Sequence, residues 1–582
     1  MFADETQHNE KLLAEVAVFV VREREEADRQ RHDIWARALP EKLLKGQTQH
    51  FVHLERAEEG NTLWAWLGDG ESRFREGDLL ALHGGNPLEN MLGRRFAFEL
   101  EEDDRWLLRG QQVAGVIDAC HGAGCYADPD TIDLTSYYER TLNEIRDSPI
   151  GRDVVLPLLG GRLDITFDAR DVADGERIAL AEGFNARQAQ AVGLALGAEQ
   201  IACIQGPPGT GKTRVLALIA RLLTQRGERV LLTSHTHMAI HNALNKVHAL
   251  GVPCVKVSRD TQRKGLDEAI ACCPSFGAWK DRPTNGYVVG ATPFATGNSR
   301  LEHCTFETVI FDEASQVTVA LALMAMRVGR RYVFIGDHKQ LPPVVLSRSV
   351  LSGESASVFA KLTSPRADHG VMLTETYRMN RWLAAWPSHQ YYGDELVAAG
   401  GNREKRLSLG AVPPHLAAVF DPAASGVFIP TRDASARTRN VRDAELVAEL
   451  CEAAVDGGVA LADIGIVTPY RAQGRAVRSL LAQRFGRDAA RQVVADTVER
   501  MQGQERELII LSLATGDEVF LGAVAGFFFQ PERLNVSITR PVSKLIVIGP
   551  ELREVPLDAE APLRGWIAQY IDLLHHLTRV VV

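Results

Sequence analysis

The chain has 582 residues, 45% of them hydrophobic and 24% charged, with a formal net charge of −10. These proportions are typical of globular proteins, the length predicts several domains, and no apolar run is long enough to cross a bilayer. The negative charge gives no general attraction to nucleic acid, so any such partner must meet a local channel.

The first 47 residues are predicted to form a helical stalk. Acidic residues precede the first apolar stretch, which differs from the basic start of a secretory leader, and we expect a cytoplasmic protein. An apolar stretch at residues 12–20 is followed by a charged run at residues 22–33. This pattern predicts a long helix whose middle is exposed to solvent.

Residues 48–110 are predicted to form a small β-barrel, an accessory domain. Short alternating segments at 50–54, 63–66, 74–82 and 95–100 are separated by turns that contain glycine or aspartate. Trp64, Trp66 and Trp106 could stack on bases, although aromatic residues in small barrels more often belong to the core. Because every nucleotide motif lies after residue 183, we expect the barrel to assist strand binding rather than ATP hydrolysis.

Residues 111–182 are interpreted as the return path from the barrel, with a helix from Thr135 to Arg146. Cys120, His121 and Cys125 could bind a metal ion, but a fourth ligand is missing and the spacing matches no familiar zinc site. Reduced thiols without a metal are the favoured interpretation.

From residue 183 onward, strand-like runs alternate with helical segments, which is typical of an α/β fold with parallel sheets. One set of runs lies at 230–233, 308–311 and 332–335, and a second lies at 464–467, 508–511 and 545–548. Only the first set is accompanied by a phosphate-binding loop. We therefore predict two similar α/β lobes, residues 183–350 and 351–582.

The phosphate-binding loop lies between the strand-like residues 201–204 and the apolar residues 215–219. Its glycines allow backbone N–H groups to wrap phosphates at the start of a helix. Lys212 is expected to reach the terminal phosphates and Thr213 to bind Mg²⁺. The loop therefore predicts a nucleoside triphosphate and Mg²⁺ as cofactors, held by Gly206, Pro207, Pro208, Gly209, Thr210, Gly211, Lys212 and Thr213.

Polar residues follow two further strand-like runs. Asp312 and Glu313 come directly after residues 309–311, at the end of a strand where α/β sheets hold ligands. We expect Asp312 to hold Mg²⁺ and Glu313 to activate the attacking water. Gln340 follows the next run, and its amide could bond to both the γ-phosphate and the water. Such a residue would report the state of the nucleotide.

These segments resemble the motifs of superfamily 1 helicases, in the branch that contains the nonsense-mediated-decay helicase and the eukaryotic replication helicase-nuclease. The resemblance covers about residues 183–550 and implies two RecA-like lobes. Pro541 stands where the family usually has a small alanine and Met501 replaces a common aromatic residue, but neither change removes a catalytic group. No nuclease carboxylate cluster and no four-cysteine iron–sulfur pattern is visible in the sequence, so any nuclease activity would belong to a partner.

The resemblance adds residues to the nucleotide site. The Gln188 amide would read adenine, which implies ATP rather than GTP, and Tyr377 would stack on the base. Arg378 and Arg540 would be arginine fingers, which can contribute on the order of 10³ to 10⁵ in rate. The nucleotide-facing residues added in this way are Asn185, Gln188, Tyr377, Gly503 and Glu505.

Strand contacts are implied by the same resemblance. Residues 233–242 are similar to the first-lobe strand-binding segment of the replication helicase, whose hydroxyls and amides can bond phosphates without reading sequence. Capping of local turns is the alternative role for such hydroxyls. The candidate nucleic-acid contacts are Ser234, Thr236, His237, Thr292, Pro293, Thr468, Tyr470, Arg471 and Thr497.

The predicted function is therefore an ATP-dependent 5′-to-3′ helicase or translocase on single-stranded nucleic acid. The polarity rests on the resemblance alone, and the sequence of residues 233–242 favours DNA over RNA. The alternative is a nucleic-acid-stimulated ATPase switch, or a remodelling subunit of a larger complex, for example with a nuclease partner, that lacks robust unwinding. The two functions share every motif.

Overall fold

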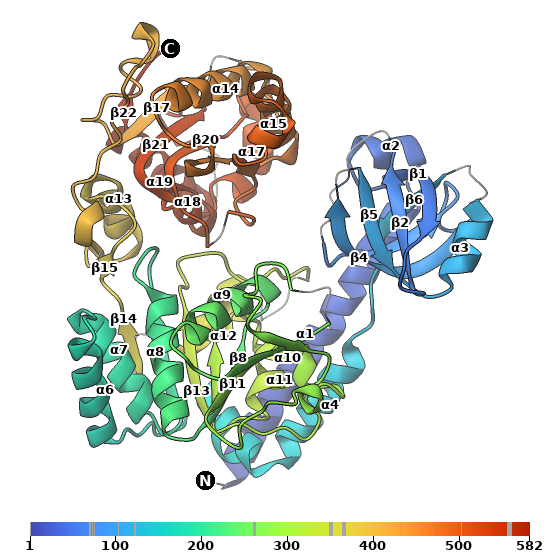
Figure 1. Ribbon diagram of the computed structural model, residues 1–582, viewed down its shortest axis with the longest axis vertical. Coiled ribbons are helices and arrows are strands. Elements are labelled where there is room, and N and C mark those ends of the chain that lie inside the picture. Colours follow the sequence, from blue (N-terminus) through green and yellow to red (C-terminus); the bar gives the residue numbers. More distant parts are fainter. Residues whose placement is uncertain are drawn as a thin grey trace.

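The computed structural model describes residues 2–582 apart from 69–71, 73, 75, 103, 121–123, 260–262, 348–352, 364–367, 432, 502 and 556–560. Figure 1 shows a barrel carried on a long helix, a first α/β lobe at the base of the view, and a second α/β lobe above it. The predicted fold class, two α/β lobes with parallel sheets plus a helical stalk and a small barrel, is confirmed.

The stalk is a single long helix, α1 (Phe2–Trp35). On one face of this helix, Leu12, Leu13, Val16, Phe19 and Val20 are buried in the same core as the central strands of the first lobe. Beyond them the helix leaves the lobe and reaches the barrel, where the Trp35 indole donates a hydrogen bond to the Pro129 carbonyl at 2.8 Å. The helix ends at Trp35, short of the predicted residue 47, and α2 (Leu39–Leu44) belongs to the barrel through the buried Lys42–Asp128 ion pair at 2.5 Å.

The barrel is closed and antiparallel, with strand order β1-β2-β5-β4-β3-β6. Its elements are β1 (Gln49–Arg56), β2 (Thr62–Leu67), β3 (Leu79–His83), β4 (Met91–Glu102), β5 (Arg105–Arg109), α3 (Val113–Cys120) and β6 (Cys125–Pro129). Because β6 closes the barrel between β1 and β3, the domain extends beyond the predicted boundary at residue 110.

The three tryptophans of the barrel divide between its two faces. Trp106 is 4% exposed and stacks on Phe98 with ring centroids 3.9 Å apart, so it belongs to the core. Trp64 and Trp66 alternate along β2 with residues that are fully buried, and the Arg105 guanidinium lies 4.0 Å from the Trp64 ring. The core interpretation was therefore wrong for these two residues, because neighbouring strand positions point to opposite faces.

The barrel carries most of the net negative charge of the chain. Residues 49–130 contain 16 acidic and 7 basic side chains, a net charge of −9 out of −10 for the whole protein. Phosphate contacts in nucleic-acid complexes come mainly from lysine and arginine. The charge therefore disfavours a barrel that grips a phosphate backbone, in contrast to the expected role in strand binding.

The return path packs against the stalk and the first lobe. It comprises α4 (Thr135–Asp147), η1 (Gly151–Val155), α5 (Leu156–Leu159) and α6 (Ala169–Ala181). The α4 helix confirms the predicted helix within one residue at its end. Helix α6 lies against α7 (Ala186–Gly197), where a Cβ on Gly175 would come within 2.8 Å of the Gly193 Cα atom. The glycines allow this close helix contact.

The first lobe is built on a parallel sheet with strand order β10-β9-β11-β8-β12-β13-β7-β14. Strand β14 pairs with β7, so this lobe extends past the predicted boundary at residue 350. Its strands are β7 (Ile201–Gln205), β8 (Arg229–Thr233), β9 (Cys254–Val257), β10 (Ala271–Cys273), β11 (Tyr287–Gly290), β12 (Thr308–Phe311), β13 (Arg331–Gly336) and β14 (Gly370–Met372). Its helices after α7 are α8 (Lys212–Gln225), α9 (His237–His248), η3 (Phe276–Ala278), α10 (Pro293–Thr296), η4 (Ala314–Gln316), α11 (Val319–Met326), η5 (Gly353–Ala356) and α12 (Val358–Leu362).

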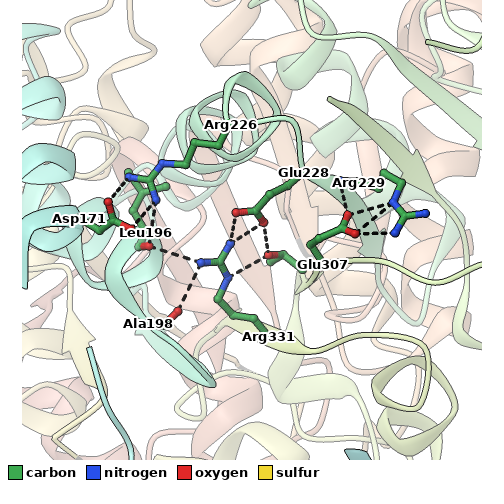
Figure 2. A network of polar contacts seen from close by, with 9 residues as sticks. Asp171, Leu196, Ala198, Arg226, Glu228, Arg229, Glu307 and Arg331 are labelled. Atoms are coloured by element: carbon green, nitrogen blue, oxygen red, sulfur yellow. Dashed lines mark hydrogen bonds and ion pairs between the residues drawn. The ribbon is translucent and has the colours of Figure 1, made fainter. Parts of the chain in front are cut away.

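Ion pairs join the helices and strands at the amino-terminal edge of this sheet (Figure 2). Arg331, the first residue of β13, bonds to Glu228 at 2.5 Å and to the carbonyls of Leu196 and Ala198. Arg226 pairs with Asp171 of α6 at 2.8 Å in the same network. These contacts occupy the amino-terminal edge of the sheet. The carboxyl-terminal edge, where α/β sheets bind ligands, is left for the site.

The second lobe has a parallel sheet with strand order β19-β18-β20-β21-β17-β22. A small pair of strands, β15 (Glu375–Thr376) and β16 (Val397–Ala398), and helix α13 (Arg381–Tyr391) lie between the two lobes in Figure 1. The other strands are β17 (Gly426–Pro430), β18 (Ile464–Val467), β19 (Val494–Asp496), β20 (Arg506–Ser512), β21 (Pro541–Gly549) and β22 (Thr578–Arg579). The other helices are η6 (Gly400–Asn402), η7 (Pro414–Leu416), α14 (Val441–Asp456), η8 (Leu461–Asp463), α15 (Arg471–Phe485), α16 (Arg487–Ala490), α17 (Glu518–Phe528), α18 (Pro531–Ile538) and α19 (Leu563–His576).

In the described ranges, no helix combines the length and the apolar character that a bilayer crossing requires. Cys120 and Cys125 are buried free thiols beside one another, and His121 lies outside the described residues. No group of three or more histidine, cysteine or acidic side chains is arranged to hold a metal ion among the residues the structure describes.

Candidate nucleotide-binding site

The phosphate-binding loop is formed between β7 and α8. Gly209 and Gly211 have φ values of 75° and 81°, a left-handed conformation that other residues rarely adopt. A Cβ atom on Gly206 would lie 2.1 Å from the Lys212 Cγ atom, so that position also excludes a side chain. The buried Thr210 hydroxyl donates to the Pro207 carbonyl at 2.8 Å and fixes the turn. The loop therefore presents its backbone at the amino terminus of a helix, as phosphate binding requires.

Three charged side chains of the first lobe meet beside this loop. Lys212 donates to the Gly206 carbonyl at 2.6 Å, and Asp312, at the end of β12, is 5% exposed. Burial raises the pKa of Asp312 to about 7, the neighbouring Glu313 adds to the rise, and Lys212 opposes it. A buried carboxylate of this kind fits a cation, because a cation would stabilise its charged form.

Glu313 is held in an unusual backbone conformation. Its φ is 50°, in the left-handed region, and its N–H donates to the Asp312 carboxylate at 3.0 Å. Such strain in a residue other than glycine is concentrated at functional sites. The turn places the two carboxylates side by side between β12 and η4. This position allows the roles expected for them, with Asp312 at the cation and Glu313 at the attacking water.

Asp337, at the end of β13, organises the segment that contains Gln340. Its carboxylate is fully buried and accepts hydrogen bonds from Gln205 at 3.2 Å, from Gln340 at 2.9 Å and from Tyr392 at 2.8 Å. Asn535 of the second lobe donates to the Lys339 carbonyl at 2.8 Å. The Gln340 amide is thus positioned by Asp337, and the segment touches both lobes.

The two predicted arginine fingers come from the second lobe. Arg378 donates to the Glu505 carboxylate at 2.8 Å and to the Thr539 carbonyl at 3.0 Å. Arg540 is 1% exposed and donates to the Val536 carbonyl at 2.9 Å. Burial, followed by the charge of Arg378, lowers the pKa of Arg540 to about 9, while Glu313 of the first lobe opposes the shift. Arg540 therefore lies within electrostatic reach of Arg378 and of Glu313.

The second lobe contacts the phosphate-binding loop directly. The Tyr377 N–H donates to the Gly209 carbonyl at 2.9 Å, and the Tyr377 hydroxyl accepts from the Asn185 amide at 2.9 Å. A Cβ atom on Gly209 would lie 2.5 Å from the Arg378 Cβ atom. The structure thus brings Asn185, the loop, Tyr377 and the first finger to one interlobe site, with Tyr377 38% exposed.

Gln188 lies at this site but does not face a nucleotide. Its side-chain oxygen accepts from the Asn185 N–H at 3.2 Å, and its NH₂ group donates to the Thr210 carbonyl at 3.0 Å. With the residue 1% exposed, both ends of the amide are used inside the protein. Reading of adenine by Gln188 stays a prediction, and it would use the second lone pair and the second N–H that these two hydrogen bonds leave on the amide.

The segment before β20 contributes through Glu505. Its carboxylate accepts a hydrogen bond from Arg378, the first predicted arginine finger, and so helps to position that side chain. Gly503 has a φ of 76° and is exposed, and Gln502, which belongs to the same predicted motif, lies outside the described residues.

The predicted strand contacts of the first lobe differ in exposure. Thr236 is exposed and caps α9 by accepting from the Ala239 N–H at 3.3 Å, whereas Ser234 and Pro293 are buried. Thr292 is half-buried at the start of α10. Burial lowers the pKa of His237 to about 3, so its ring is neutral at pH 7 and can contact a phosphate by a hydrogen bond only.

Unpaired polar atoms mark the end of β8 and the start of α9. The Thr233 and Ser234 hydroxyls and the Nδ1 atoms of His235 and His237 are buried without a hydrogen-bond partner. Buried polar groups are normally paired, and unpaired ones indicate a missing ligand or water. This group supports a polar ligand or water near residues 233–237, a segment that the family resemblance singled out.

The second-lobe strand contacts are mostly buried. Thr468 is fully buried and Thr497 is 6% exposed, so neither hydroxyl is offered to a strand in this structure. Tyr470 is half-buried next to Arg471, the first residue of α15. For Ser234, Pro293, Thr468 and Thr497, direct side-chain contact is therefore not what the structure shows. Sequence resemblance identified the segments but not which atoms are exposed.

Comparison with known proteins agrees with this geometry. Two family models, each described as an AAA domain, match residues 183–398 and 354–551. The mouse (Mus musculus) DNA replication ATP-dependent helicase/nuclease DNA2 is 31% identical over 417 residues, which are 66% of this chain and 38% of that protein. The DNA polymerase alpha-associated DNA helicase A of Schizosaccharomyces pombe is 25% identical over 477 residues, 71% of this chain and 69% of that protein.

The part of this chain that carries the motifs is similar to superfamily 1 helicases. The chain spans well under half the length of the mouse relative, and the matched part of the chain is the one that carries the predicted motifs. The crystal structure of Arterivirus nonstructural protein 10 (helicase) shares 13% identity with a TM-score of 0.39, and covers 89% of this chain and 80% of that one. That likeness is too distant to bear on the function.

The motif-bearing part of the chain also contains interlobe residues that the sequence motifs did not single out. Asp337, Tyr392 and Asn535 join the two lobes around the segment after β13. Asp337 could have been found by the reasoning applied to Asp312, since it also follows a strand at the carboxyl edge of the sheet. Tyr392 and Asn535 give no such signal, because their role depends on how the lobes dock.

Proposed function

We propose that this protein is an ATP-dependent helicase or translocase that moves 5′ to 3′ on single-stranded nucleic acid, with DNA as the favoured track. The observation that carries the proposal is the interlobe site. The phosphate-binding loop, Asp312 and Glu313 of the first lobe face Arg378 and Arg540 of the second, with Tyr377 bonded to Gly209 between them. ATP bound there would contact both lobes.

ATP binding would begin at the loop. Its N–H groups and Lys212 would hold the phosphates, and Thr213 and Asp312 would hold Mg²⁺, which when bound neutralises charge on the β- and γ-phosphates. Glu313 would take a proton from the attacking water. Gln340, fixed by Asp337, would orient that water and sense the γ-phosphate.

The arginine fingers link hydrolysis to lobe movement. Arg378 is bound by Glu505 and a backbone carbonyl, so it must exchange these partners for the γ-phosphate. Arg540 donates to a backbone carbonyl of the helix that precedes it. Its guanidinium would therefore move less than that of Arg378 when the lobes close. Closure of the lobes on ATP and opening after hydrolysis would alternate the grip of each lobe on the strand.

The nature of the track is supported by the relatives. The mouse protein is named as a DNA replication helicase/nuclease and the fission yeast protein as a DNA helicase, and the exposed Thr236 hydroxyl at the start of α9 suits a sugar-phosphate backbone, which carries no sequence information. We therefore expect a sequence-independent track with strong dependence on salt.

Direction of movement is tested with tailed duplexes. Duplexes with only a 5′ or only a 3′ single-stranded overhang are offered with ATP, and strand displacement is measured by gel or fluorescence. We expect displacement of the 5′-tailed duplex at least about tenfold faster, because a 5′-to-3′ motor must load on a free 5′ tail. Efficient displacement confined to the 3′-tailed substrate would contradict the proposed polarity.

The same assay addresses the alternative function. An ATPase switch or a remodelling subunit, for example of a complex with a nuclease, would show hydrolysis stimulated by the strand without displacement of either duplex. Stimulated hydrolysis together with displacement supports a motor.

A further inference from the structure

The stalk helix joins the first lobe to the barrel. One face of its lower half, which includes Leu12, Val16 and Phe19, is buried in the lobe core. Its upper half holds the barrel through Trp35 and through Arg31, whose guanidinium donates to the Thr131 hydroxyl at 2.7 Å. Any movement of α1 relative to the lobe would therefore move the barrel.

The segment Asp337–Ser347 contacts the first lobe, the second lobe and the stalk; we name it the bridging segment. It begins at the sheet of the first lobe, where Asp337 holds Gln340. Tyr392 and Asn535 of the second lobe bind its first residues, and Leu341 is buried in the core of the second lobe. Its other end reaches the stalk. A displacement of Gln340 can therefore be transmitted along the backbone of this segment toward α1.

Glu23 is the polar link between the stalk and the bridging segment. One carboxylate oxygen accepts from the Leu346 N–H at 3.0 Å and the other from the Ser347 N–H at 2.6 Å, across 323 residues of sequence. Hydrogen bonds to a charged acceptor are stronger than those between neutral groups. Glu23 sits on α1 between the part buried in the lobe and the part that holds the barrel.

Apolar packing around this link is incomplete. A cavity of about 420 Å³ separates α1 from the first lobe here, and Phe19, Glu23, Tyr138, Pro343 and Leu346 are among the residues that line it. Val344 is 85% exposed and Leu346 is 42% exposed. Val345 packs against the core that the lobe shares with α1, while Val344 and Leu346 do not, so the two hydrogen bonds of Glu23 are the polar contact that fixes the end of the segment on the helix.

We infer that Glu23 is a positioning residue that couples the nucleotide state sensed at Gln340 to the stalk and the barrel. ATP-driven closure would shift the second lobe and Gln340, the bridging segment would follow, and Glu23 would pass the displacement to α1. This inference rests on the proposed function, in which ATP binds between the lobes. It gives the acidic barrel a mechanical role that needs no contact with phosphates.

The inference is tested with Glu23→Ala, and with Glu23→Gln, which retains the side-chain volume and one carbonyl acceptor. Amide hydrogen exchange of α1 is measured with and without a non-hydrolysable ATP analogue and Mg²⁺. We expect the analogue to change exchange in the α1 residues around Glu23 in the wild type. The change should be lost in Glu23→Ala and partly retained in Glu23→Gln. Strand displacement per ATP hydrolysed should fall about five- to tenfold in Glu23→Ala, within the usual range of coupling between sites.

Glu25→Ala is the matched control, because Glu25 is exposed on the same helix and belongs to no hydrogen bond or ion pair in the described part of the chain. It should behave as the wild type. The ATPase rate without nucleic acid should be unchanged in all variants, since Glu23 is remote from Lys212 and Glu313 in the chain and contacts neither. The exchange measurement does not depend on unwinding. The coupling can therefore be tested even if the chain separates no duplex. An α1 that does not respond to the analogue, or that responds equally in Glu23→Ala, would overturn the coupling.

Discussion

Lys212→Ala is expected to lower the ATPase rate by about 10³-fold or more, the size of effect seen when a single preorganised group is removed from a phosphoryl-transfer site. The ammonium is lost where the charge of the triphosphate is greatest, next to the loop whose backbone it now contacts at Gly206. Nucleotide affinity should fall as well. Both quantities are measured by steady-state hydrolysis and by titration with a fluorescent ATP analogue.

A lysine elsewhere on the same lobe provides the control. Lys246 is exposed on α9, and Lys246→Ala should leave hydrolysis within about twofold of the wild type, since surface substitutions rarely matter. If Lys212→Ala and Lys246→Ala hydrolyse ATP equally well, the loop at 206–213 is not the catalytic phosphate site.

Glu313→Gln is expected to separate ATP binding from hydrolysis. The amide keeps the volume of the side chain but cannot take a proton from water, so the ATPase rate should fall by about 10²- to 10⁴-fold. Nucleotide affinity should stay close to that of the wild type. The strained backbone at Glu313 and its bond to Asp312 do not depend on the carboxylate that is changed.

Comparison of the two variants sharpens this test. Glu313→Gln should accumulate with ATP bound and Lys212→Ala without it, so their affinities for a single strand in the presence of ATP should differ. A wild-type hydrolysis rate for Glu313→Gln at saturating nucleic acid would show that another group activates the water.

Much of the nucleotide site could be predicted from the sequence because its residues act close to where their strands end. The loop at 206–213, Asp312 and Gln340 each follow a buried strand, and the order of strands in a parallel sheet brings such ends together. The exposure of the strand-contact residues could not be predicted in this way. Ser234 and Thr468 are in the expected segments but are fully buried, which depends on packing between distant elements.

Features that depend on how whole domains dock could not be predicted from the sequence pattern. The alternation along β2 indicates two faces but not which face carries Trp64, and the closing strand β6 follows a helix that hides the continuity of the barrel. Gln188 has the residue type suited to adenine, yet the adjacent Asn185 and Thr210 satisfy its amide in the structure. Glu23 gives no signal at all, since its partners are backbone groups 323 residues away.

We propose that the interlobe site hydrolyses ATP in response to a single strand. The decisive measurement is the ATPase rate of the full chain with Mg²⁺ against increasing single-stranded DNA and, in parallel, single-stranded RNA. We expect a rate that rises at least about tenfold and saturates, with DNA effective at lower concentration than RNA, and no rise in Lys212→Ala. A wild-type rate that neither strand changes would show that the site is not the motor of a strand-dependent ATPase.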